Sequence, residues 1–236
     1  MVTVTETMYD AGSADRGSWP NLTAPCTRSS RRGASGAPAP IAQPPVTALD
    51  PMAARSLVGL ADLPTIVAIG PFDDRAHAQQ LAAALIAVRQ QSKAQLVLLG
   101  TGVQHTILMQ STSARGFGSN VHAVADSSGD RWSNFVAAAD LVVLSSSAAT
   151  STLLDVLAAG RPVVAPADPA TVQLLVPGIA GLVYRPGDAS GMEGALRRLL
   201  TTPVLRRGMG GRARQVARRH DLELRVREQS DGGKQI

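Results

Sequence analysis

A serine-rich turn between an apolar run and a helix is the part of this sequence best suited to chemistry. The turn, residues 145–147, follows the run LVVL and precedes a helical segment that begins near Thr150 and ends at Gly160. A second apolar run, PVVA, comes next. The first N–H groups of a helix have no partner within it and bind phosphate and other anions. Residues 141–166 therefore predict half of a nucleotide-binding α/β unit, with its ligand at the turn.

Motifs for several other chemistries are incomplete. The glycine turn at residues 100–102 lacks the third glycine of the dinucleotide fingerprint. The sequence has neither a Walker A lysine motif nor a G-x-S-x-G nucleophile elbow. Cys26 is the only cysteine, so no disulfide within the chain and no cysteine-based zinc site is expected. Metal-ligand spacing is also missing around the four histidines, His77, His105, His122 and His220. Neither a cofactor nor a metal ion is therefore expected.

Six apolar runs separated by helical patterns predict the elements that position the turn. The runs cover residues 65–70, 94–99, 120–124, 139–144, 162–165 and 181–184. This alternation predicts an α/β fold: a single Rossmann-like, doubly wound, mostly parallel six-stranded sheet with helices on both faces. Ligands of such sheets bind beyond the carboxyl ends of the strands. The turns after the first, second, third, fourth and fifth runs are therefore candidate binding loops.

Several helix starts carry capping signals, among them Thr202 followed by Pro203. Asp73 or Asp74 is expected to cap the helix after the first strand, because a short carboxylate there accepts hydrogen bonds from free N–H groups. Ser190 and Glu193 have the spacing of a capping box.

The composition divides the chain into three parts. Residues 1–60 are rich in Pro, Gly, Ser, Thr and Ala and lack an apolar period, which predicts a disordered tail. Residues 61–222 are enough for one domain, and residues 223–236 are predicted to be a polar C-terminal tail. The N-terminus lacks the basic start and apolar core of a signal peptide. No apolar run approaches the ~18 residues that cross a bilayer, so a cytoplasmic location is expected.

The net charge is +5, almost all of the basic residues are arginines, and many of these arginines gather in residues 197–219. Such clusters are usually the solvated faces of helices. A second interpretation is peripheral contact with an anionic membrane surface. The chain has only three Phe, two Trp and two Tyr, and these do not alternate with basic residues, so nucleic-acid binding is not expected.

Several segments together resemble the C-terminal, donor-binding domain of the GT-B-type retaining glycosyltransferases, the glycosyl transferases group 1. LLDVLAAGRPVVA is similar to the family's leucine-glutamate-alanine-methionine-alanine segment and the glycine after it. VAIGPF and LVLLGTG resemble its first two strands with their glycine turns. AAADLVVLSS, GIAGLVYRPGD and residues 205–219 resemble later segments. The resemblance extends over most of residues 64–220 and implies one half of a GT-B fold. Sixty polar residues are too few to build the acceptor domain. Three alternatives stay open: a second polypeptide supplies that domain, the chain is a fragment of a longer two-domain enzyme, or the chain does not catalyse transfer.

The resemblance implies that the protein binds a nucleotide-diphosphate sugar and transfers its glycosyl group, of the hexosyl type, to an acceptor hydroxyl with retained configuration. In that function Arg75 offsets phosphate charge and, with Ser147, contributes to catalysis as well as binding. Asp155 holds the ribose. The other residues that the resemblance assigns to the nucleotide sugar are Gly70, Gly100, Gly102, Thr150 and Gln173.

The sequence departs from the family pattern where the family carries its chemistry. Ser147 stands in place of the first glutamate and Asp155 in place of the second. Pro71 replaces an arginine, and Ala76 a lysine. Two interpretations stay open for Arg75, a phosphate contact or an exposed first-turn arginine, and two for Ser147, a sugar hydrogen bond or a turn residue. The alternative function is a truncated or degenerate, non-catalytic module that binds a nucleotide or a partner protein.

Overall fold

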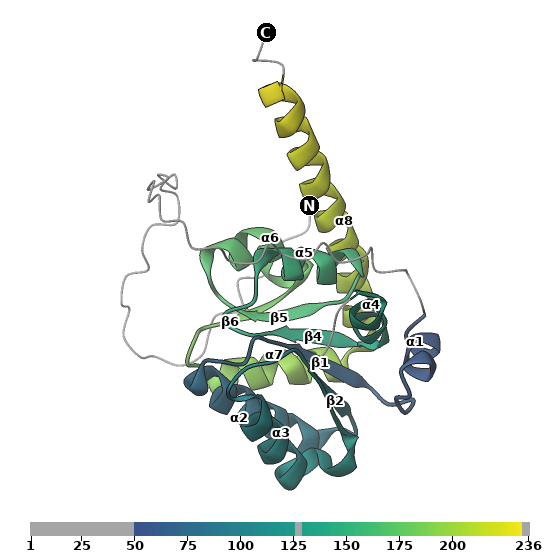
Figure 1. The fold of residues 1–236 in the computed structure, drawn as a ribbon, viewed down its shortest axis with the longest axis vertical. Helices are drawn as coiled ribbons and strands as arrows, with labels where there is room; N and C mark the ends of the chain where they lie inside the picture. Colours follow the sequence, from purple (N-terminus) through teal and green to yellow (C-terminus); the bar gives the residue numbers. More distant parts are fainter. Residues whose placement is uncertain (1–49, 126–128, 233–236) are drawn as a thin grey trace, which may run out of the picture. The chain divides into compact units, whose positions relative to one another are not determined.

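The computed structural model describes residues 50–125 and 129–232 (Figure 1). Their six strands form one sheet in the order β3-β2-β1-β4-β5-β6, and every neighbouring pair is parallel. The strands are β1 (Thr65–Ile69), β2 (Gln95–Leu99), β3 (Val121–Val124), β4 (Leu141–Leu144), β5 (Val163–Pro166) and β6 (Gly181–Tyr184). This order confirms the predicted doubly wound, Rossmann-like sheet. The direction of winding reverses between β1 and β4, which is where such folds bind ligands.

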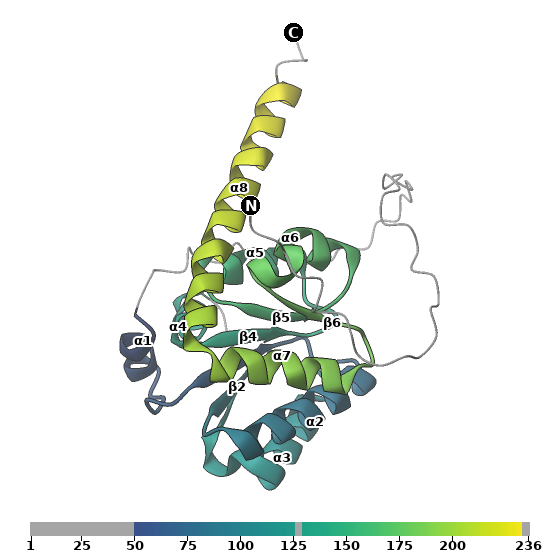
Figure 2. The same cartoon turned by 180° about the vertical axis from the view of Figure 1, so that it is seen from behind.

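Helices cover both faces of the sheet, as Figures 1 and 2 show. Helices α2, α3 and α7 pack on one face, whereas α1, α4, α5 and α6 pack on the other. Helix α8 contributes to both cores, through Met209 on the first face and Ala213 on the second. The helices are α1 (Pro51–Leu57), α2 (Arg75–Gln91), α3 (His105–Thr112), α4 (Gly129–Ala138), α5 (Thr150–Ala158), α6 (Pro169–Ile179), α7 (Ala189–Thr201) and α8 (Pro203–Gly232), with the short turns η1 (Ser113–Phe117) and η2 (Gly118–Asn120) after α3.

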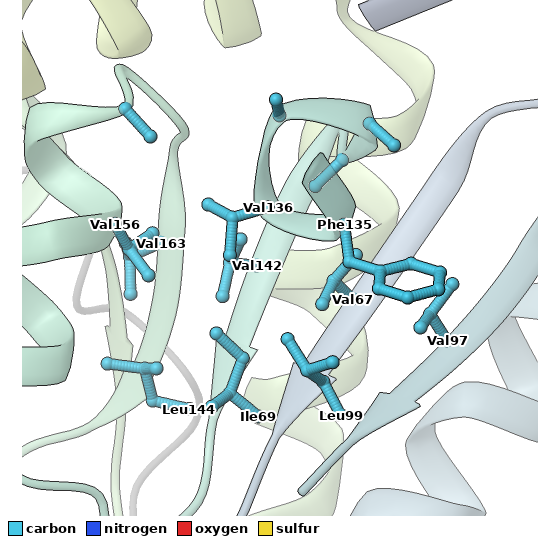
Figure 3. Close-up of a cluster of buried hydrophobic side chains, with 14 of the residues drawn as sticks. Val67, Ile69, Val97, Leu99, Phe135, Val136, Val142, Leu144, Val156 and Val163 are labelled. Atoms are coloured by element: carbon cyan, nitrogen blue, oxygen red, sulfur yellow. The ribbon is translucent and has the colours of Figure 1, made fainter. Parts of the chain in front are cut away.

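The central strands are buried along their whole length, because both of their faces are covered. Figure 3 shows one of the two cores, in which Val67, Val97 and Val142 of neighbouring strands lie beside Phe135 of α4 and Val156 of α5. Burying each such side chain stabilises the fold by roughly 1.5–3 kcal/mol. The apolar runs of the sequence are therefore continuous rather than alternating.

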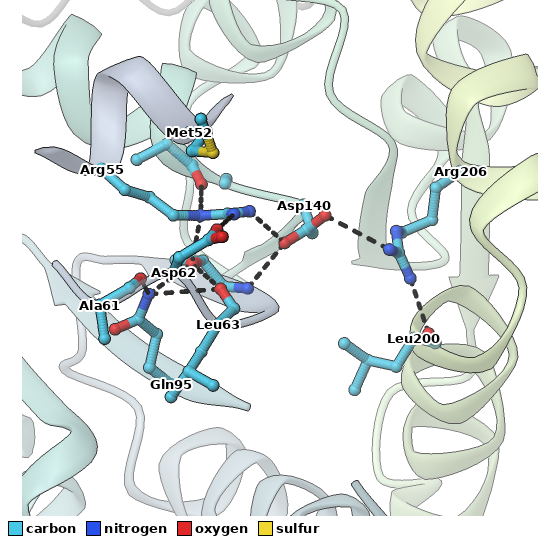
Figure 4. A network of polar contacts seen from close by, with 12 residues as sticks. Met52, Arg55, Ala61, Asp62, Leu63, Gln95, Asp140, Leu200 and Arg206 are labelled. Carbon is cyan, nitrogen blue, oxygen red and sulfur yellow. Dashed lines mark hydrogen bonds and ion pairs between the residues drawn. The ribbon is translucent and has the colours of Figure 1, made fainter. Parts of the chain in front are cut away.

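A polar network centred on the buried Arg55 connects α1 to the sheet (Figure 4). Arg55 of α1 donates to Asp140 at 2.5 Å, to Asp62 at 2.9 Å and to the hydroxyl of Thr65 at 3.0 Å. Asp140 also accepts from the backbone N–H of Thr65 at 2.8 Å and forms an ion pair with Arg206 of α8 at 3.3 Å. One carboxylate thus joins the first described helix, the first strand and the last helix.

The described residues differ from the predicted tails at both ends. Most of the predicted tail, residues 1–49, lies outside the described residues, but residues 51–57 form α1. At the other end, residues 223–232 are the last part of α8, whereas the sequence predicts a polar tail there. Leu, Glu, Arg and Gln, which fill much of this stretch, are good helix formers, so the helix has no local reason to stop at residue 222.

The helix caps settle two expectations. Asp74 caps α2 and accepts from Ala76 N–H at 2.9 Å, while Asp73 accepts from Val103 N–H in the loop after β2. The predicted capping box at Ser190 is wrong. Asp188 caps α7 instead and accepts from Gly191 N–H at 2.8 Å, which leaves Ser190 inside the helix. The carboxylate of Asp188, two residues before Ser190, accepts the hydrogen bond from the first turn of the helix, so the helix begins before Ser190.

Candidate functional site

A small cavity of about 140 Å³ lies at the carboxyl ends of β4 and β5. The turn after β4, the first turns of α5 and α6, and the end of β5 surround it. It is lined by Leu144, Ser145, Ser146, Ala148, Ala149, Thr150, Leu153, Ala165, Pro166, Asp168 and Thr171. The cavity therefore lies at the serine-rich turn, where the sequence predicts a ligand.

Helix α5 presents an uncapped N-terminus to this cavity. Its N-cap residue is Ala149, which offers no side-chain acceptor to the N–H groups of the first turn. Helix α6 differs, because Asp168 accepts from the N–H groups of Ala170 and Thr171 at 3.0 Å each and also from the Thr171 hydroxyl. Free N–H groups and the helix dipole attract anions. Of the two helix ends at the cavity, α5 is therefore the one suited to an anion.

Ser145 adds an unsatisfied hydroxyl to the same cavity. The residue is 5% exposed, and its Oγ atom has no hydrogen-bond partner among the described residues. Its backbone N–H donates to the carbonyl of Ile69 at 3.0 Å, which ties the turn to β1. Leaving a buried hydroxyl unpaired costs about 1–3 kcal/mol, so such a group is expected to meet a polar ligand or water.

The loop after β1 meets the serine turn. Ser146 donates to the carboxylate of Asp74 at 3.4 Å. The hydrogen bond from the backbone N–H of His77 lowers the pKa of Asp74, which keeps the carboxyl ionised. This negative charge opposes an anion in the cavity. Arg75, the next residue, is exposed at the start of α2 and is the nearest basic residue in sequence to this contact.

The three glycines singled out in the sequence, Gly70, Gly100 and Gly102, pack the loops after β1 and β2 against each other. A Cβ atom on Gly102 would lie 2.5 Å from the carbonyl carbon of Phe72, and Gly102 has a φ of +143°. A Cβ atom on Gly100, at a φ of +117°, would lie 3.4 Å from the nitrogen of Gly70. None of the three lines the cavity. They hold the loop that leads to Arg75.

The remaining sequence-predicted residues are spread around the cavity rather than gathered in it. Thr150 lines it, and Ser147 is exposed beside it. Asp155 lies on α5, where burial raises the pKa of its carboxyl. Gln173 is exposed on α6 and lines a different, larger groove. None of Arg75, Ser147, Asp155 and Gln173 is among the residues that line the cavity.

Three lining residues, Ser145, Asp168 and Thr171, were not predicted as site residues. Ser145 directly follows the end of β4, and Asp168 is the second residue after the end of β5. That position after a parallel strand is the signal that identifies them.

His77 and Tyr184 form a buried pair where α2 begins and β6 ends. Their rings stack with centroids 6.5 Å apart, and neither His77 Nε2 nor the Tyr184 hydroxyl has a partner among the described residues. Burial lowers the pKa of His77, although the charge of Asp74 opposes this, and burial raises the pKa of Tyr184. Both side chains are therefore neutral near pH 7.

Within residues 50–125 and 129–232, no three His, Cys, Asp or Glu side chains gather so that they could hold a metal ion. No helix in this described part of the chain is both long and apolar enough to span a membrane.

The family of the chain follows from its sequence. Residues 63–202 match the family model described as "Glycosyl transferases group 1". The match covers more than half of the chain, and the protein belongs to this family. Its described fold is that of a GT-B C-terminal domain. A comparison with curated protein sequences found no match.

Solved structures share this fold. Sucrose-phosphate synthase from Thermosynechococcus elongatus superposes with a TM-score of 0.64 at 22% identity, over 80% of this chain and 51% of that one. The C-terminal domain of the group 1 family protein LpcC from Francisella tularensis gives 0.59 at 16% identity, over 71% of this chain and 95% of that domain. Anabaena Alr3699/HepE, solved with UDP and glucose, superposes with a TM-score of 0.60 at 19% identity, over 77% of this chain and 52% of that one. The chain thus spans about half the length of sucrose-phosphate synthase and of Alr3699/HepE.

Proposed function

We propose that the chain binds a nucleotide-diphosphate sugar at the carboxyl ends of β4 and β5 and transfers its glycosyl group to an acceptor hydroxyl. The observation that carries this proposal is the uncapped N-terminus of α5 beside the unpaired hydroxyl of Ser145. Membership of the group 1 family supports it, as does the complex of the similar Alr3699/HepE with UDP and glucose.

In this function the diphosphate lies against the first turn of α5. The N–H groups of that turn and the hydroxyls of Ser145 and Thr150 donate to phosphate oxygens, which stabilises the charge that develops on the leaving diphosphate. Arg75 offsets part of the same charge. The repulsion from Asp168 is weakened, because its carboxylate is already hydrogen-bonded.

The remaining proposed contacts lie outside the small cavity. Ser147 and Gln173 hydrogen-bond sugar hydroxyls, and Asp155 holds the ribose. Gly70, Gly100 and Gly102 let the nucleotide approach the loop backbones. A nucleotide sugar is much larger than a 140 Å³ cavity, so these contacts extend over its rim. The acceptor half of the site is supplied by a second polypeptide, and the location is cytoplasmic.

A second candidate function is a non-catalytic module that binds a nucleotide or a partner protein. The specific observation that favours it is the composition of the cavity, whose lining residues include no arginine or lysine. The exposed Ser147 supplies no charge either.

Nucleotide binding by the full chain tests the proposed function. Calorimetry with UDP, GDP and ADP in parallel is expected to show one preferred diphosphate. Ala149→Asp supplies the missing cap and adds a negative charge, so it is expected to weaken that binding at least tenfold. Ser190→Asp adds the same charge to the first turn of α7, outside the cavity lining, and is expected to change the affinity less than twofold.

The two candidates separate at the next step. Equal affinities for Ala149→Asp and the unmodified chain would remove the site proposed here. Binding with slow hydrolysis of the matching nucleotide sugar favours the enzyme, because a group 1 donor site activates the glycosyl bond. Binding of the nucleotide sugar without any turnover, with or without added acceptor, favours the non-catalytic module.

A further inference from the structure

A larger groove lies between α6 and α8. Its volume is about 640 Å³, inside the range of roughly 300–1,000 Å³ typical of ligand sites. Thr150, at the first turn of α5, lines both this groove and the small cavity, so the two adjoin. The groove is lined by Thr150, Ala170, Gln173, Leu174, Val176, Ile179, Arg212, Gln215, Val216, Arg219, His220 and Glu223.

The α6 wall of the groove is apolar. It consists mainly of Leu174, Val176 and Ile179, of which Val176 is 47% exposed and Ile179 42% exposed. Val176 has a φ of +40°, a left-handed conformation that is unfavourable for a β-branched residue. The fold thus holds an apolar side chain at the surface in a strained conformation. Such strain occurs preferentially at ligand-binding and catalytic sites.

The α8 wall of the groove is basic. Arg212, Val216, Arg219 and Glu223 recur at helical spacing and share one face, and the two arginines lie two turns apart, about 10 Å. Both are exposed, and no ion pair joins either of them to another described residue. His220 adds an imidazole to this wall, and Glu223 is its one acidic side chain. Arginine binds phosphate through paired N–H donors.

We propose that this groove binds a single-chain lipid phosphate. Its phosphate pairs with Arg212 and Arg219, and its hydrocarbon chain lies along Leu174, Val176 and Ile179. One wall that is cationic and one that is apolar match a ligand with both characters, whereas a free anion would leave the apolar wall exposed to water.

Calorimetry on the full chain tests the binding itself. The probes are decyl phosphate below its micelle concentration, inorganic phosphate, and decyl maltoside, which has the same chain and a neutral head. Decyl phosphate is expected to bind at least tenfold more tightly than either of the others. Comparable affinity of inorganic phosphate would reveal a simple anion site, and comparable affinity of decyl maltoside would reveal a purely apolar groove; each would overturn the proposal.

Matched variants locate the site. The double variant Arg212→Gln/Arg219→Gln is expected to weaken decyl phosphate at least tenfold. Arg207→Gln/Arg218→Gln removes two exposed arginines of the same helix that do not line the groove, and a change below twofold is expected. Ile179→Gln is expected to weaken binding at least threefold, whereas Val204→Gln, 73% exposed on α8, is expected to leave it unchanged. If both double arginine variants weakened decyl phosphate binding equally, the arginines would attract the phosphate without a defined site, and the proposed site would be overturned.

The same variants keep the two proposals apart. Arg212→Gln/Arg219→Gln is expected to retain the affinity for the preferred nucleoside diphosphate, with an unchanged circular dichroism spectrum. Decyl phosphate binding without any nucleotide binding would retain the groove as a lipid phosphate site and reject the donor site proposed above. Nucleotide binding without decyl phosphate binding would reject the groove as a lipid site and leave it as a surface for a protein partner.

Discussion

The guanidinium of Arg55 donates to the carboxylate of Asp140 at 2.5 Å, although 85 positions separate the two residues. The side chains are 10% and 18% exposed, and the same carboxylate also accepts from Thr65 N–H and pairs with Arg206. Removing one partner of a buried ion pair leaves the other charge unpaired, which is more damaging than losing the pair itself. Asp140 is therefore a central structural residue remote from the donor cavity.

Replacing this carboxylate is expected to destabilise the fold strongly. We expect Asp140→Ala to lower the free energy of unfolding by about 3–5 kcal/mol, because Arg55 and Arg206 lose their shared partner. Urea denaturation followed by circular dichroism measures this. Glu193→Ala serves as the control, since Glu193 and Arg197 form a partly exposed pair one helical turn apart, and a loss of about 0.3–0.5 kcal/mol is expected. Similar losses in both variants would contradict the central role of Asp140.

Gly102 is expected to tolerate no side chain. In Gly102→Ala the new methyl group would meet the backbone of Phe72 at 2.5 Å, so the loops after β1 and β2 must separate. Gly187 also has a positive φ, +87°, but no atom lies within 4 Å of the Cβ position there. Thermal unfolding is expected to show a cost of about 1 kcal/mol for Gly187→Ala and several times that for Gly102→Ala. Nucleotide binding should weaken in Gly102→Ala alone.

Removing the charge of Asp155 is expected to stabilise the fold and to weaken nucleotide binding. Burial raises the pKa of its carboxyl, so the charged form destabilises the folded state above that pKa, and this cost disappears as the pH falls and the folded protein takes up the proton. Asp155→Asn should therefore raise the melting temperature at pH 7 and have no such benefit near pH 3. If Asp155 holds the ribose, the same variant also weakens nucleotide binding. A gain that persisted unchanged at pH 3 would show that charge burial is not its cause.

His77 is expected to make the protein sensitive to mild acid. Its pKa is lowered by burial, so below about pH 6.5 the unfolded chain binds a proton that the folded chain does not, and stability falls as the pH decreases. His77→Phe should reduce the difference in urea midpoint between pH 8 and pH 5.5. Tyr184→Phe, which removes the unpaired hydroxyl stacked on His77, should leave that difference in place. An equal difference in His77→Phe and the unmodified chain would contradict this assignment.

Much of the fold could be predicted from local sequence. Runs such as TIVAI and QLVLL are apolar at every position after the first, and such continuous runs are typical of strands buried on both faces. The helical patterns between the runs then favour a parallel sheet. The cap at Asp74 could also be predicted from local sequence, because Asp74 accepts hydrogen bonds from residues only two and three positions further along the chain.

Features that depend on distant contacts could not be predicted. Helix α1 has a local start signal in Asp50 and Pro51, which the polar composition of residues 1–60 obscured. Its place against the sheet depends on Arg55, whose partner Asp140 lies far along the chain. The donor cavity shows the same limit. Thr150 was predicted, but the burial of Ser145 depends on the packing around β4 and β5. Gln173 was assigned through the family pattern, and its position facing α8 depends on how that long helix crosses α6.

The complete burial of β1, β2, β4 and β5 also bears on how this family diverges. Inside such a sheet the volume and polarity of a side chain matter more than its identity, because exchanging apolar side chains of similar size changes the free energy of unfolding only slightly. Most substitutions among Val, Ile, Leu and Ala can therefore accumulate without moving the strands. The match to sucrose-phosphate synthase, with a TM-score of 0.64 at 22% identity over 80% of this chain, agrees with such tolerance. The loops at the carboxyl edge of the sheet can therefore change in sequence, and so bind different ligands, while the strands keep their positions.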